Sequence, residues 1–358
     1  MRVLHFLKSG EYSGAQNVIC QIMEAFDNIE DIEMAYCSEG GEIQGVLEKK
    51  HFTFYEINGM NKRELLRIIE LYHPDIIHAH DFSAGVVASL YAPKGIIIIN
   101  HLHNNPSWIK KINIKTMIYL VASRNFEKIL TVSEAVNREY IFGRRIASKV
   151  EVIGNPFNAK EICDKAEEEE RKENSDIVFI GRLTEQKDPI KFIQIVDEVK
   201  KKKEDICAMM IGTGEMEAEC QAAIQKLHLE NHIKMVGFKK NPYVYLKNAI
   251  ILCMPSKWEG FGLVALEAMA LGKPVVASDV GGLHEIVTES CGHHADKIED
   301  YAEYILSLLT DKNLYKKVSC RARQRAEEYS NIDVYMERLR RIYMKEGNYG
   351  TNVSFWSM

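Results

Sequence analysis

The stretch A-I-I-L-C-M-P-S-K-W-E-G-F-G-L-V-A-L-E-A-M-A-L-G-K-P-V-V-A-S-D-V-G-G-L-H-E-I-V, residues 249–287, decides the fold of this chain. Two short apolar runs alternate in it with glycine-rich loops and with segments of helical composition. Short apolar runs of this kind are typical of buried parallel strands. The expected elements are a strand over Ile250–Met254, a loop over Glu259–Gly262, a helix over Leu263–Leu271, a strand over Pro274–Ala277 and a second glycine turn over Asp279–Glu285 that opens another helix.

Two loop-to-helix junctions at the ends of parallel strands predict a site for anions, because helix N-termini carry unpaired N–H groups and partial positive charge. Glu259 and Glu267 are eight positions apart. If both were helical, they would be separated by about 12 Å along the axis. Paired glycosidase carboxylates need about 5 to 9.5 Å. We therefore expect two separate contacts along one long polar ligand, with a sugar at one end and a ribose at the other.

The length of 358 residues predicts two domains, each with its own core. The chain is 46% hydrophobic and 27% charged, which is ordinary for a globular protein. A net charge of −5 gives no reason to expect nucleic-acid binding. None of the eight cysteines forms C-x-x-C, so we expect free thiols in a reducing cytoplasm. We expect no signal peptide, because the apolar core of the first ten residues is too short, and no transmembrane helix, because no apolar run approaches 18 residues.

The strand-and-helix pattern occurs twice, which predicts an α/β fold of two Rossmann-like domains with mostly parallel sheets. The first domain is expected over residues 1–157 and the second over 158–330, with the segment 331–358 packing back on the first. A highly charged run, Lys160–Asn174, is expected to form a solvated linker helix after the boundary. The last residues, Asn348–Met358, are expected to form a loose tail or a strap.

Histidines follow two strands of the predicted first domain, in I-I-H-A-H (76–80) and in G-I-I-I-I-N-H-L-H (95–103). Ligands of open α/β sheets bind at such strand ends. His80 and His103 are expected to lie further out and are the better candidates for substrate contact, whereas His78 and His101 are expected to pack structurally. A four-histidine metal site is the less favoured alternative, because no Asp/Glu cluster and no D-x-D motif supports it.

In the second half, Arg182 and Lys187 flank the loop that follows the strand Asp176–Ile180. Arginine offers a fork of donors and lysine a point charge, so together they suit a diphosphate without a metal ion. The alternative is that both are ordinary surface cations. Near the N-terminus, Gly14 either contacts an anion through its backbone or forms a plain turn. No G-x-G-x-x-G motif is present, which argues against a dehydrogenase.

Residues 101–150 hold nine Lys/Arg and three Glu, a net charge of +6 in an acidic chain. Within this region, the segment Trp108–Leu120 mixes basic, apolar and aromatic residues. One interpretation is a surface that contacts an anionic membrane or a lipid phosphate. The other is a partly buried helix with a solvated basic face.

With G-R-L-T-E-Q-K (181–187) and the 255–287 segment, the chain resembles the retaining family-4 nucleotide-sugar glycosyltransferases, which have the two-domain GT-B fold. Shorter matches are P-D-I-I-H-A-H (74–80), T-V-S-E-A-V (131–136) and V-I-G-N-P (152–156). The chain departs from the family at Ser13–Gln16, where G-G-A-E is frequent, at His284, where proline is usual, and at Asn155–Asn158, where N-G-x-D is usual.

The resemblance implies roles for particular residues. Arg182, Lys187 and Gly14 would hold the donor diphosphate, and Glu267 would bind the ribose. Glu259 would lie at the donor sugar, with backbone groups of Gly260, Phe261, Gly262 and Leu263 nearby. His103 would be the active-site histidine, with His101 as second choice and His80 as a further candidate. No metal ion and no cofactor would be needed.

The implied function is transfer of a hexose or N-acetylhexosamine from a nucleotide sugar, such as a UDP-sugar, to a saccharide or polyprenyl-linked acceptor. Enzymes of this kind assemble capsule and exopolysaccharide at the inner face of the cell membrane, so a cytoplasmic protein with peripheral membrane contact is expected. A sugar-nucleotide epimerase, a glycosidase and a non-catalytic sugar-nucleotide-binding protein are the alternatives.

Overall fold

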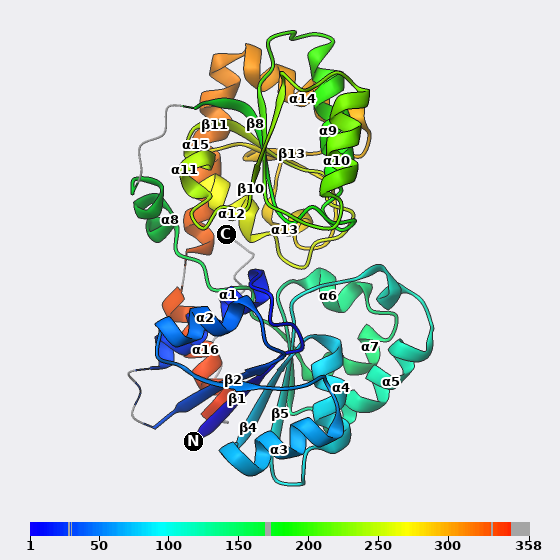
Figure 1. The fold of residues 1–358 in the computed structure, drawn as a ribbon, viewed down its shortest axis with the longest axis vertical. Coiled ribbons are helices and arrows are strands. Elements are labelled where there is room, and N and C mark those ends of the chain that lie inside the picture. Colours follow the sequence, from blue (N-terminus) through cyan, green and yellow to red (C-terminus); the bar gives the residue numbers. More distant parts are fainter. Residues whose placement is uncertain (28, 30, 169–172, 331, 345–358) are drawn as a thin grey trace. The chain divides into compact units, whose positions relative to one another are not determined.

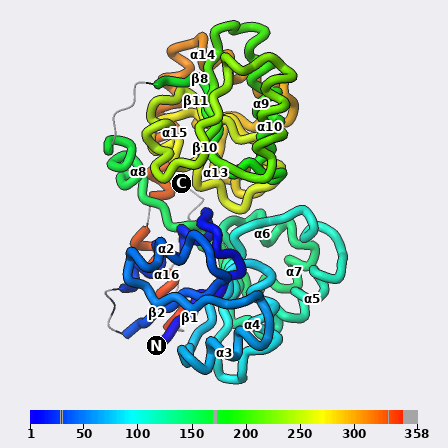
Figure 2. The backbone as a smooth tube through the Cα atoms, in the orientation of Figure 1, coloured from blue at the N-terminus to red at the C-terminus, as the bar shows by residue number. Residues whose placement is uncertain are grey.

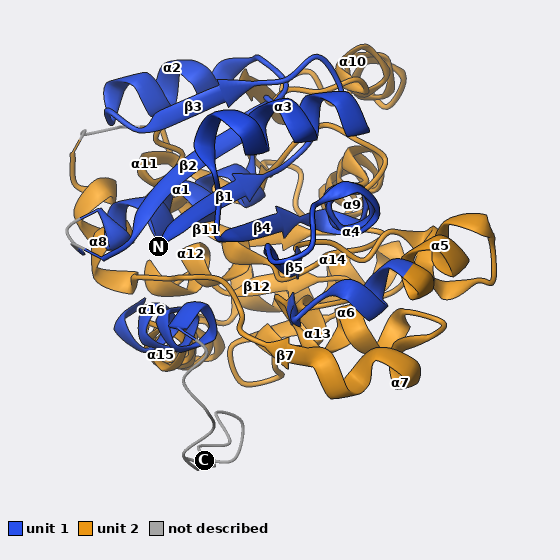
Figure 3. Cartoon of the chain, turned by 90° about the horizontal axis from the view of Figure 1, so that it is seen from below, with its two compact units in different colours: residues 1–101, 122–130, 332–358 blue, residues 102–121, 131–331 orange. Residues whose placement is uncertain are grey.

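The computed structural model describes residues 1–344 apart from 28, 30, 169–172 and 331. The predicted tail Asn348–Met358 lies outside the described residues. The chain forms two sheets with helices on their faces, which confirms the α/β prediction (Figure 1). Figure 3 colours two compact units, one made of residues 1–101, 122–130 and 332–358, the other of 102–121 and 131–331. The predicted domain limits at 157 and 330 stay a prediction.

The first sheet has seven strands in the order β3-β2-β1-β4-β5-β6-β7. Its pairings from β3 to β5 are parallel. The central strands are almost wholly buried, as expected for a sheet covered on both faces. The strands are β1 (Arg2–Phe6), β2 (Glu33–Ser38), β3 (Thr53–Glu56), β4 (Ile76–His80), β5 (Ile97–Leu102), β6 (Lys128–Thr131) and β7 (Val150–Val152).

The second sheet has six parallel strands in the order β10-β9-β8-β11-β12-β13. The order reverses direction beside β8, the first of its strands in the chain, and such a switch point is where open α/β sheets bind ligands. The strands are β8 (Ser175–Ile180), β9 (Ala208–Ile211), β10 (Ile233–Gly237), β11 (Ala249–Met254), β12 (Val275–Ala277) and β13 (Gly292–His294).

Helices connect the strands, as parallel pairing requires. Those before β8 are α1 (Gly14–Phe26), α2 (Glu42–Lys49), α3 (Lys62–Tyr72), α4 (Asp81–Tyr91), η1 (Ser107–Lys110), α5 (Ile114–Ala122), η2 (Ser123–Asn125), α6 (Glu134–Glu139), α7 (Gly143–Ile146), η3 (Ala147–Lys149) and α8 (Ala159–Ala166). Those after β8 are α9 (Pro189–Lys200), α10 (Glu217–Lys226), α11 (Tyr243–Lys247), α12 (Leu263–Ala270), α13 (Leu283–Ile286), α14 (Ile298–Thr310), α15 (Lys312–Tyr329) and α16 (Ile332–Met344).

Two helices, α8 and α16, bear on predictions made from the sequence. The helix predicted over Lys160–Asn174 ends at Ala166, and α8 buries Ile162 and Ala166, so it is not simply a solvated linker. The last helix, α16, belongs to the first unit, where Tyr343 packs against the Phe26 ring of α1 with centroids 5.7 Å apart. Figure 2 shows this return of the chain, with the red end of the tube beside the blue beginning.

Candidate active site

The loop after β8 presents the two cations predicted for the diphosphate. Asp188 ends this loop in the left-handed region, at a φ of +48°, and its carboxylate accepts a hydrogen bond from the Lys191 amide at 3.3 Å. Pro189 fills the first position of α9, where no N–H is required. Leu183 is fully buried beneath the loop. Arg182 is exposed, and among the described residues no carboxylate pairs with it.

This loop is fastened to the glycine loop that follows β11. The Lys257 amide donates to the Gln186 carbonyl at 2.8 Å, and the Gln186 side-chain amide donates to the Trp258 carbonyl at 3.1 Å. These bonds cross between segments about seventy residues apart in the chain, and they bring the two predicted donor-binding loops together at the carboxyl edge of the sheet.

Lys187 and Glu259 form an ion pair at this junction, with Nζ and Oε2 2.6 Å apart. The side chains are only 14% and 12% exposed, so water screens the pair weakly. The stem of Lys187 packs against Gly181, since a Cβ there would lie 3.4 Å from Lys187 Cγ, an ordinary contact distance. The structure therefore places these two predicted site residues in direct contact.

The second glycine turn holds the backbone of Glu259. The Gly282 amide donates to the Glu259 carbonyl at 3.1 Å. Gly281 has a φ of +53°, and a Cβ at this position would lie 1.7 Å from the same carbonyl oxygen. A side chain is therefore excluded at Gly281 both by the backbone conformation and by the space.

The glycines between Glu259 and α12 are also required by packing. A Cβ on Gly260 would lie 2.0 Å from the carbonyl oxygen of His103, which belongs to the same compact unit. Gly262, with a φ of +107°, precedes Leu263 at the start of α12. Phe261 is buried and its ring meets that of Tyr329 edge-on, with centroids 6.1 Å apart.

Glu267 lies on α12, whereas Glu259 lies in the loop before it, so the two glutamates do not share the single helix assumed in the 12 Å estimate. The Tyr243 hydroxyl donates to Glu267 Oε1 at 3.2 Å. Burial raises the pKa of Glu267 to about 7, and the Tyr243 hydrogen bond opposes this only partly. Its charge is therefore set by small changes in pH near neutrality.

His103 reaches the glycine loop through its backbone, next to Gly260. Burial lowers the pKa of its imidazole to about 3, because desolvation disfavours the charged form. The imidazole is therefore neutral at physiological pH and supplies no positive charge there.

The other predicted histidines lie in the core of the first unit. His80 does not lie further out than His78, as the sequence indicated, because both are fully buried, as is His101. The reason is a fourth histidine, His5 on β1, whose Nδ1 lies 3.0 Å from His80 Nε2. The ring of His101 stacks on that of His78, with centroids 5.4 Å apart.

Sequence reasoning missed His5. The signal was a histidine within the first predicted strand. In the parallel pairing of β1 with β4, His5 stands opposite His78, so their side chains lie on the same face of the sheet. His78 itself is anchored from α16, with its Nδ1 2.7 Å from the Tyr343 hydroxyl. These imidazoles thus form a packed layer over the sheet.

Gly14 is the first residue of α1. A Cβ built on it meets nothing within 4 Å, so the first unit itself does not require glycine there.

Two further polar contacts to the glycine loops were not predicted. The Ser133 hydroxyl donates to the Gly260 carbonyl at 2.7 Å, and Glu285 accepts from the Ala135 amide at 3.1 Å. Both partners lie where T-V-S-E-A-V begins α6, a segment that the sequence comparison matched without assigning it a role.

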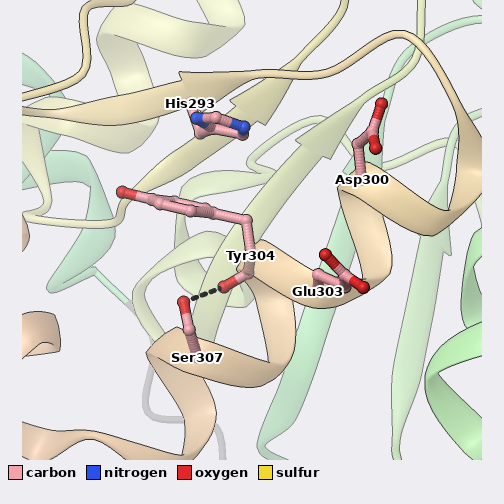
Figure 4. A pocket seen from close by; sticks show the side chains of 5 residues that line it. All are labelled: His293, Asp300, Glu303, Tyr304 and Ser307. Atoms are coloured by element: carbon pink, nitrogen blue, oxygen red, sulfur yellow. Dashed lines mark hydrogen bonds between the residues drawn. The ribbon is translucent and has the colours of Figure 1, made fainter.

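A surface pocket of about 360 Å³ lies elsewhere in the second unit, lined by His293, Asp300, Glu303, Tyr304 and Ser307 (Figure 4). Its carboxylates make it unsuited to a diphosphate. None of the predicted donor-site residues lines it.

Two parallel-stranded α/β sheets, with glycine loops and cations gathered at the carboxyl edge of the second, define a glycosyltransferase of the GT-B class. The chain belongs to the family-4 group 1 glycosyltransferases: residues 37–161 match the family model described as Glycosyltransferase Family 4, and residues 161–325 match Glycosyl transferases group 1.

Individual relatives are also named as glycosyltransferases. The uncharacterized glycosyltransferase MJ1178 of Methanocaldococcus jannaschii is 30% identical over 271 residues, which are 74% of this chain and 73% of that protein. The match to MJ1059 of the same organism is 28% identical and spans 64% of that relative. The Escherichia coli UDP-Gal:alpha-D-GlcNAc-diphosphoundecaprenol alpha-1,3-galactosyltransferase is 21% identical, with 96% and 97% of the chains covered.

Among solved structures, Anabaena Alr3699/HepE in complex with UDP and glucose shares the fold, with a TM-score of 0.84 and 20% identity. The match covers 97% of this chain and all of that one.

Proposed function

We propose that this chain is a retaining, metal-independent glycosyltransferase that moves a hexose or N-acetylhexosamine from a UDP-sugar to a saccharide or polyprenyl-linked acceptor. Its place would be the assembly of cell-surface polysaccharide such as capsule or exopolysaccharide. The observation that carries the proposal is the Lys187–Glu259 pair at the junction of two glycine loops, with Arg182 exposed beside it.

The donor would lie along this edge. Arg182 and Lys187 would hold the diphosphate, so that two side-chain cations supply the charge that a metal ion supplies elsewhere. Glu259, with backbone groups from Gly260 to Leu263, would hold the sugar, and Glu267 the ribose hydroxyls. His103 would meet the sugar with a neutral imidazole, and Gly14 is the remaining residue that we assign to the diphosphate.

Retention would follow from attack of the acceptor hydroxyl on the same face that the diphosphate leaves. The acceptor oxygen bonds to the anomeric carbon, the bond to the diphosphate oxygen breaks, and the diphosphate takes the hydroxyl proton. The Lys187–Glu259 pair supports this scheme, because a glutamate already bound to a lysine is a poor nucleophile. NMR of the first product tests it: an anomer inverted from that of the donor excludes retention.

The choice of donor and acceptor is supported by the relatives, one of which is named as acting with UDP-Gal on a diphosphoundecaprenol-linked sugar. Incubation with UDP-sugars, with and without a polyprenyl-diphosphate saccharide, tests this choice. An epimerase would change the donor without acceptor, whereas a sugar-nucleotide-binding protein without catalytic activity would change nothing.

Such an acceptor would require contact with a membrane, and α5 offers a surface for it. Among the described residues, five of the eleven exposed large apolar side chains cluster on and just before this helix. They are Ile112 (68% exposed), Ile114 (70%), Met117 (52%), Ile118 (41%) and Val121 (55%). The opposite face, with Thr116, Tyr119 and Ala122, is buried, so the exposed apolar side chains lie on the face of α5 that points away from the core.

The charge around α5 favours an anionic lipid surface as the partner. The sequence contains no Asp or Glu from residue 82 to residue 126, whereas Lys110, Lys111 and Lys115 border the apolar side chains. The ammonium group of Lys115 lies 5.6 Å from the centre of the Trp108 ring, and tryptophan prefers the membrane interface. Among the described residues, no helix is long and apolar enough to cross a bilayer.

Vesicle sedimentation tests this surface. We expect the protein to sediment with phosphatidylglycerol-containing vesicles but not with pure phosphatidylcholine, and Ile114→Gln with Ile118→Gln to lower binding at least tenfold. Leu71→Gln with Leu90→Gln, on α3 and α4, is the matched control, because these leucines are 58% and 53% exposed. Equal loss in both double variants would contradict a specific surface on α5.

A further inference from the structure

Three side chains with metal-ligating atoms meet beside the end of β12 in the second unit. Asp279 follows this strand by two residues, His294 ends the neighbouring strand β13, and His284 is the second residue of α13. Their ligand atoms all lie within 4.8 Å of one another. The transfer reaction proposed above uses none of the three.

The hydrogen bonding of His294 fixes which of its nitrogens is free. Its Nε2 lies 2.9 Å from the carbonyl oxygen of Val287. A carbonyl can only accept, so Nε2 carries the hydrogen and, in the neutral ring, Nδ1 carries a lone pair. That Nδ1 is buried and has no hydrogen-bond partner among the described residues. It is the arrangement of a metal-ligating histidine held by a backbone carbonyl.

Nδ1 of His294 faces the carboxylate of Asp279. His294 Nδ1 lies 3.9 Å from Asp279 Oδ1, and the same oxygen lies 2.6 Å from His284 Nδ1. The imidazoles of His284 and His294 are nearly parallel, with centroids 6.0 Å apart. A lone pair and a carboxylate that face each other repel, and either a proton on Nδ1 or a metal ion bound between them removes this repulsion.

We propose that Asp279, His284 and His294 bind a zinc ion. Two imidazoles and one carboxylate are a usual ligand set for zinc, whereas magnesium and calcium prefer oxygen ligands. Zinc at about 2.0–2.2 Å from tetrahedral ligands places those ligands roughly 3.3 Å apart. The observed separations of 2.6 and 3.9 Å lie on both sides of this value. The side chains that would rotate on binding are Asp279 and His284, which are 51% and 55% exposed.

The neighbouring His293 provides a contrast within the same strand. Successive strand residues point to opposite faces, so His293 lies away from the cluster. Its ring stacks on Tyr304 with centroids 4.4 Å apart, as Figure 4 shows, and its Nδ1 lies 2.9 Å from Glu289 Oε2. It is a second histidine–carboxylate pair, with side chains 29% and 70% exposed, and among the described residues it belongs to no cluster of three metal-ligating groups.

Zinc there would fix one end of the turn from Asp279 to Glu285, whose amide at Gly282 holds the Glu259 carbonyl. The ion would be structural, so this inference does not depend on the proposed transfer reaction. It predicts a higher melting temperature with zinc, and no requirement for zinc in turnover.

Calorimetry with ZnCl₂ on the full chain, after removal of any histidine tag, tests the proposal. We expect one saturable site, matched by a tetrahedral absorption band with CoCl₂ and by no response to MgCl₂. Asp279→Asn and His284→Gln should each weaken zinc binding at least tenfold. His293→Gln should change it less than twofold.

Both substituted ligands are exposed, so their variants are expected to fold, and circular dichroism checks this. The proposal is overturned if the folded wild-type chain shows no saturable zinc binding. It is also overturned if Asp279→Asn and His284→Gln bind zinc as tightly as the wild type, or if His293→Gln weakens binding as much as they do.

Discussion

Lys187 Nζ lies 2.6 Å from Glu259 Oε2, across two loops that are 72 residues apart in the chain. The pair neutralises a cation that the proposed function assigns to the donor diphosphate. Binding of the diphosphate would therefore compete with Glu259 for Lys187. The two residues then have opposite effects on diphosphate binding. Lys187 attracts the diphosphate, whereas Glu259 competes with it for the Lys187 ammonium group.

Glu259→Gln should separate nucleotide binding from turnover. The substitution keeps the shape of the side chain but removes the charge that pairs with Lys187, so we expect UDP to bind as tightly as in the wild type or a few-fold tighter. Transfer should fall at least a hundredfold if the carboxylate contacts the sugar during reaction, since such a contact supplies about 3 kcal/mol. Calorimetry with UDP and a transfer assay measure the two effects. If Glu259→Gln lost both UDP affinity and transfer activity, Glu259 would not act in transfer alone, contrary to the prediction.

The pH dependence of UDP binding should report Glu267. Its pKa is raised to about 7, and the ionised carboxylate is the better acceptor for ribose hydroxyls. Affinity should therefore rise between pH 6 and pH 8 in the wild type. Glu267→Gln should bind more weakly at pH 8 and lose this slope. An unchanged slope in the variant would mean that another group titrates.

The same raised pKa has a consequence for stability. The folded state holds a proton on Glu267 more tightly than the unfolded chain does, so this stabilising contribution is present below the unfolded pKa of 4.5 and is lost as the pH rises through about 7. In Glu267→Gln this loss of stability between pH 6 and pH 8 should be absent. Denaturant titrations of both proteins at the two pH values measure the free energy of unfolding.

Gly281→Ala should destabilise the second unit by about 2 kcal/mol or more, because the backbone is left-handed and the new methyl group would overlap the Glu259 carbonyl. Gly45→Ala on α2 is the matched control. A Cβ there meets nothing within 4 Å, so alanine should stabilise that helix by roughly 0.5–1 kcal/mol. Chemical denaturation compares the two, and equal stability of both variants would contradict the packing described at Gly281.

Chelation with EDTA should show that transfer does not require a metal ion, whether or not zinc binds at the site proposed above. If Arg182 and Lys187 neutralise the diphosphate, transfer should persist in excess EDTA, and added Mg²⁺ should change its rate by less than twofold. Loss of transfer in EDTA that Mg²⁺ restores would show that a metal ion holds the donor.

Much of this fold was predictable because its signals are local. Apolar runs such as Ile250–Met254 and the glycines after them set the strands and loops within a few residues. The pairing of Lys187 with Glu259 was not predictable by spacing, since it depends on how two distant loops meet. The prediction that His80 lies further out than His78 failed for a similar reason, because the environment of His80 is made by His5, 75 residues earlier.

The site assignment itself came from the resemblance to known glycosyltransferases, and residue chemistry alone left alternatives open. Arg182 and Lys187 could have been ordinary surface cations. The burial of Lys187 is what distinguishes it, because a lysine that is only 14% exposed is costly to desolvate without a partner.

The central claim is that Lys187 holds the donor diphosphate, and calorimetric titration of UDP into Lys187→Ala tests it most directly. The matched control is Lys257→Ala, which removes a lysine paired with Glu185 at 3.3 Å in the same two loops. Loss of a charge-assisted hydrogen bond of about 1.5–3 kcal/mol predicts affinity at least tenfold weaker in Lys187→Ala. Lys257→Ala should stay within twofold of the wild type. Wild-type UDP affinity in a folded Lys187→Ala chain would contradict the account.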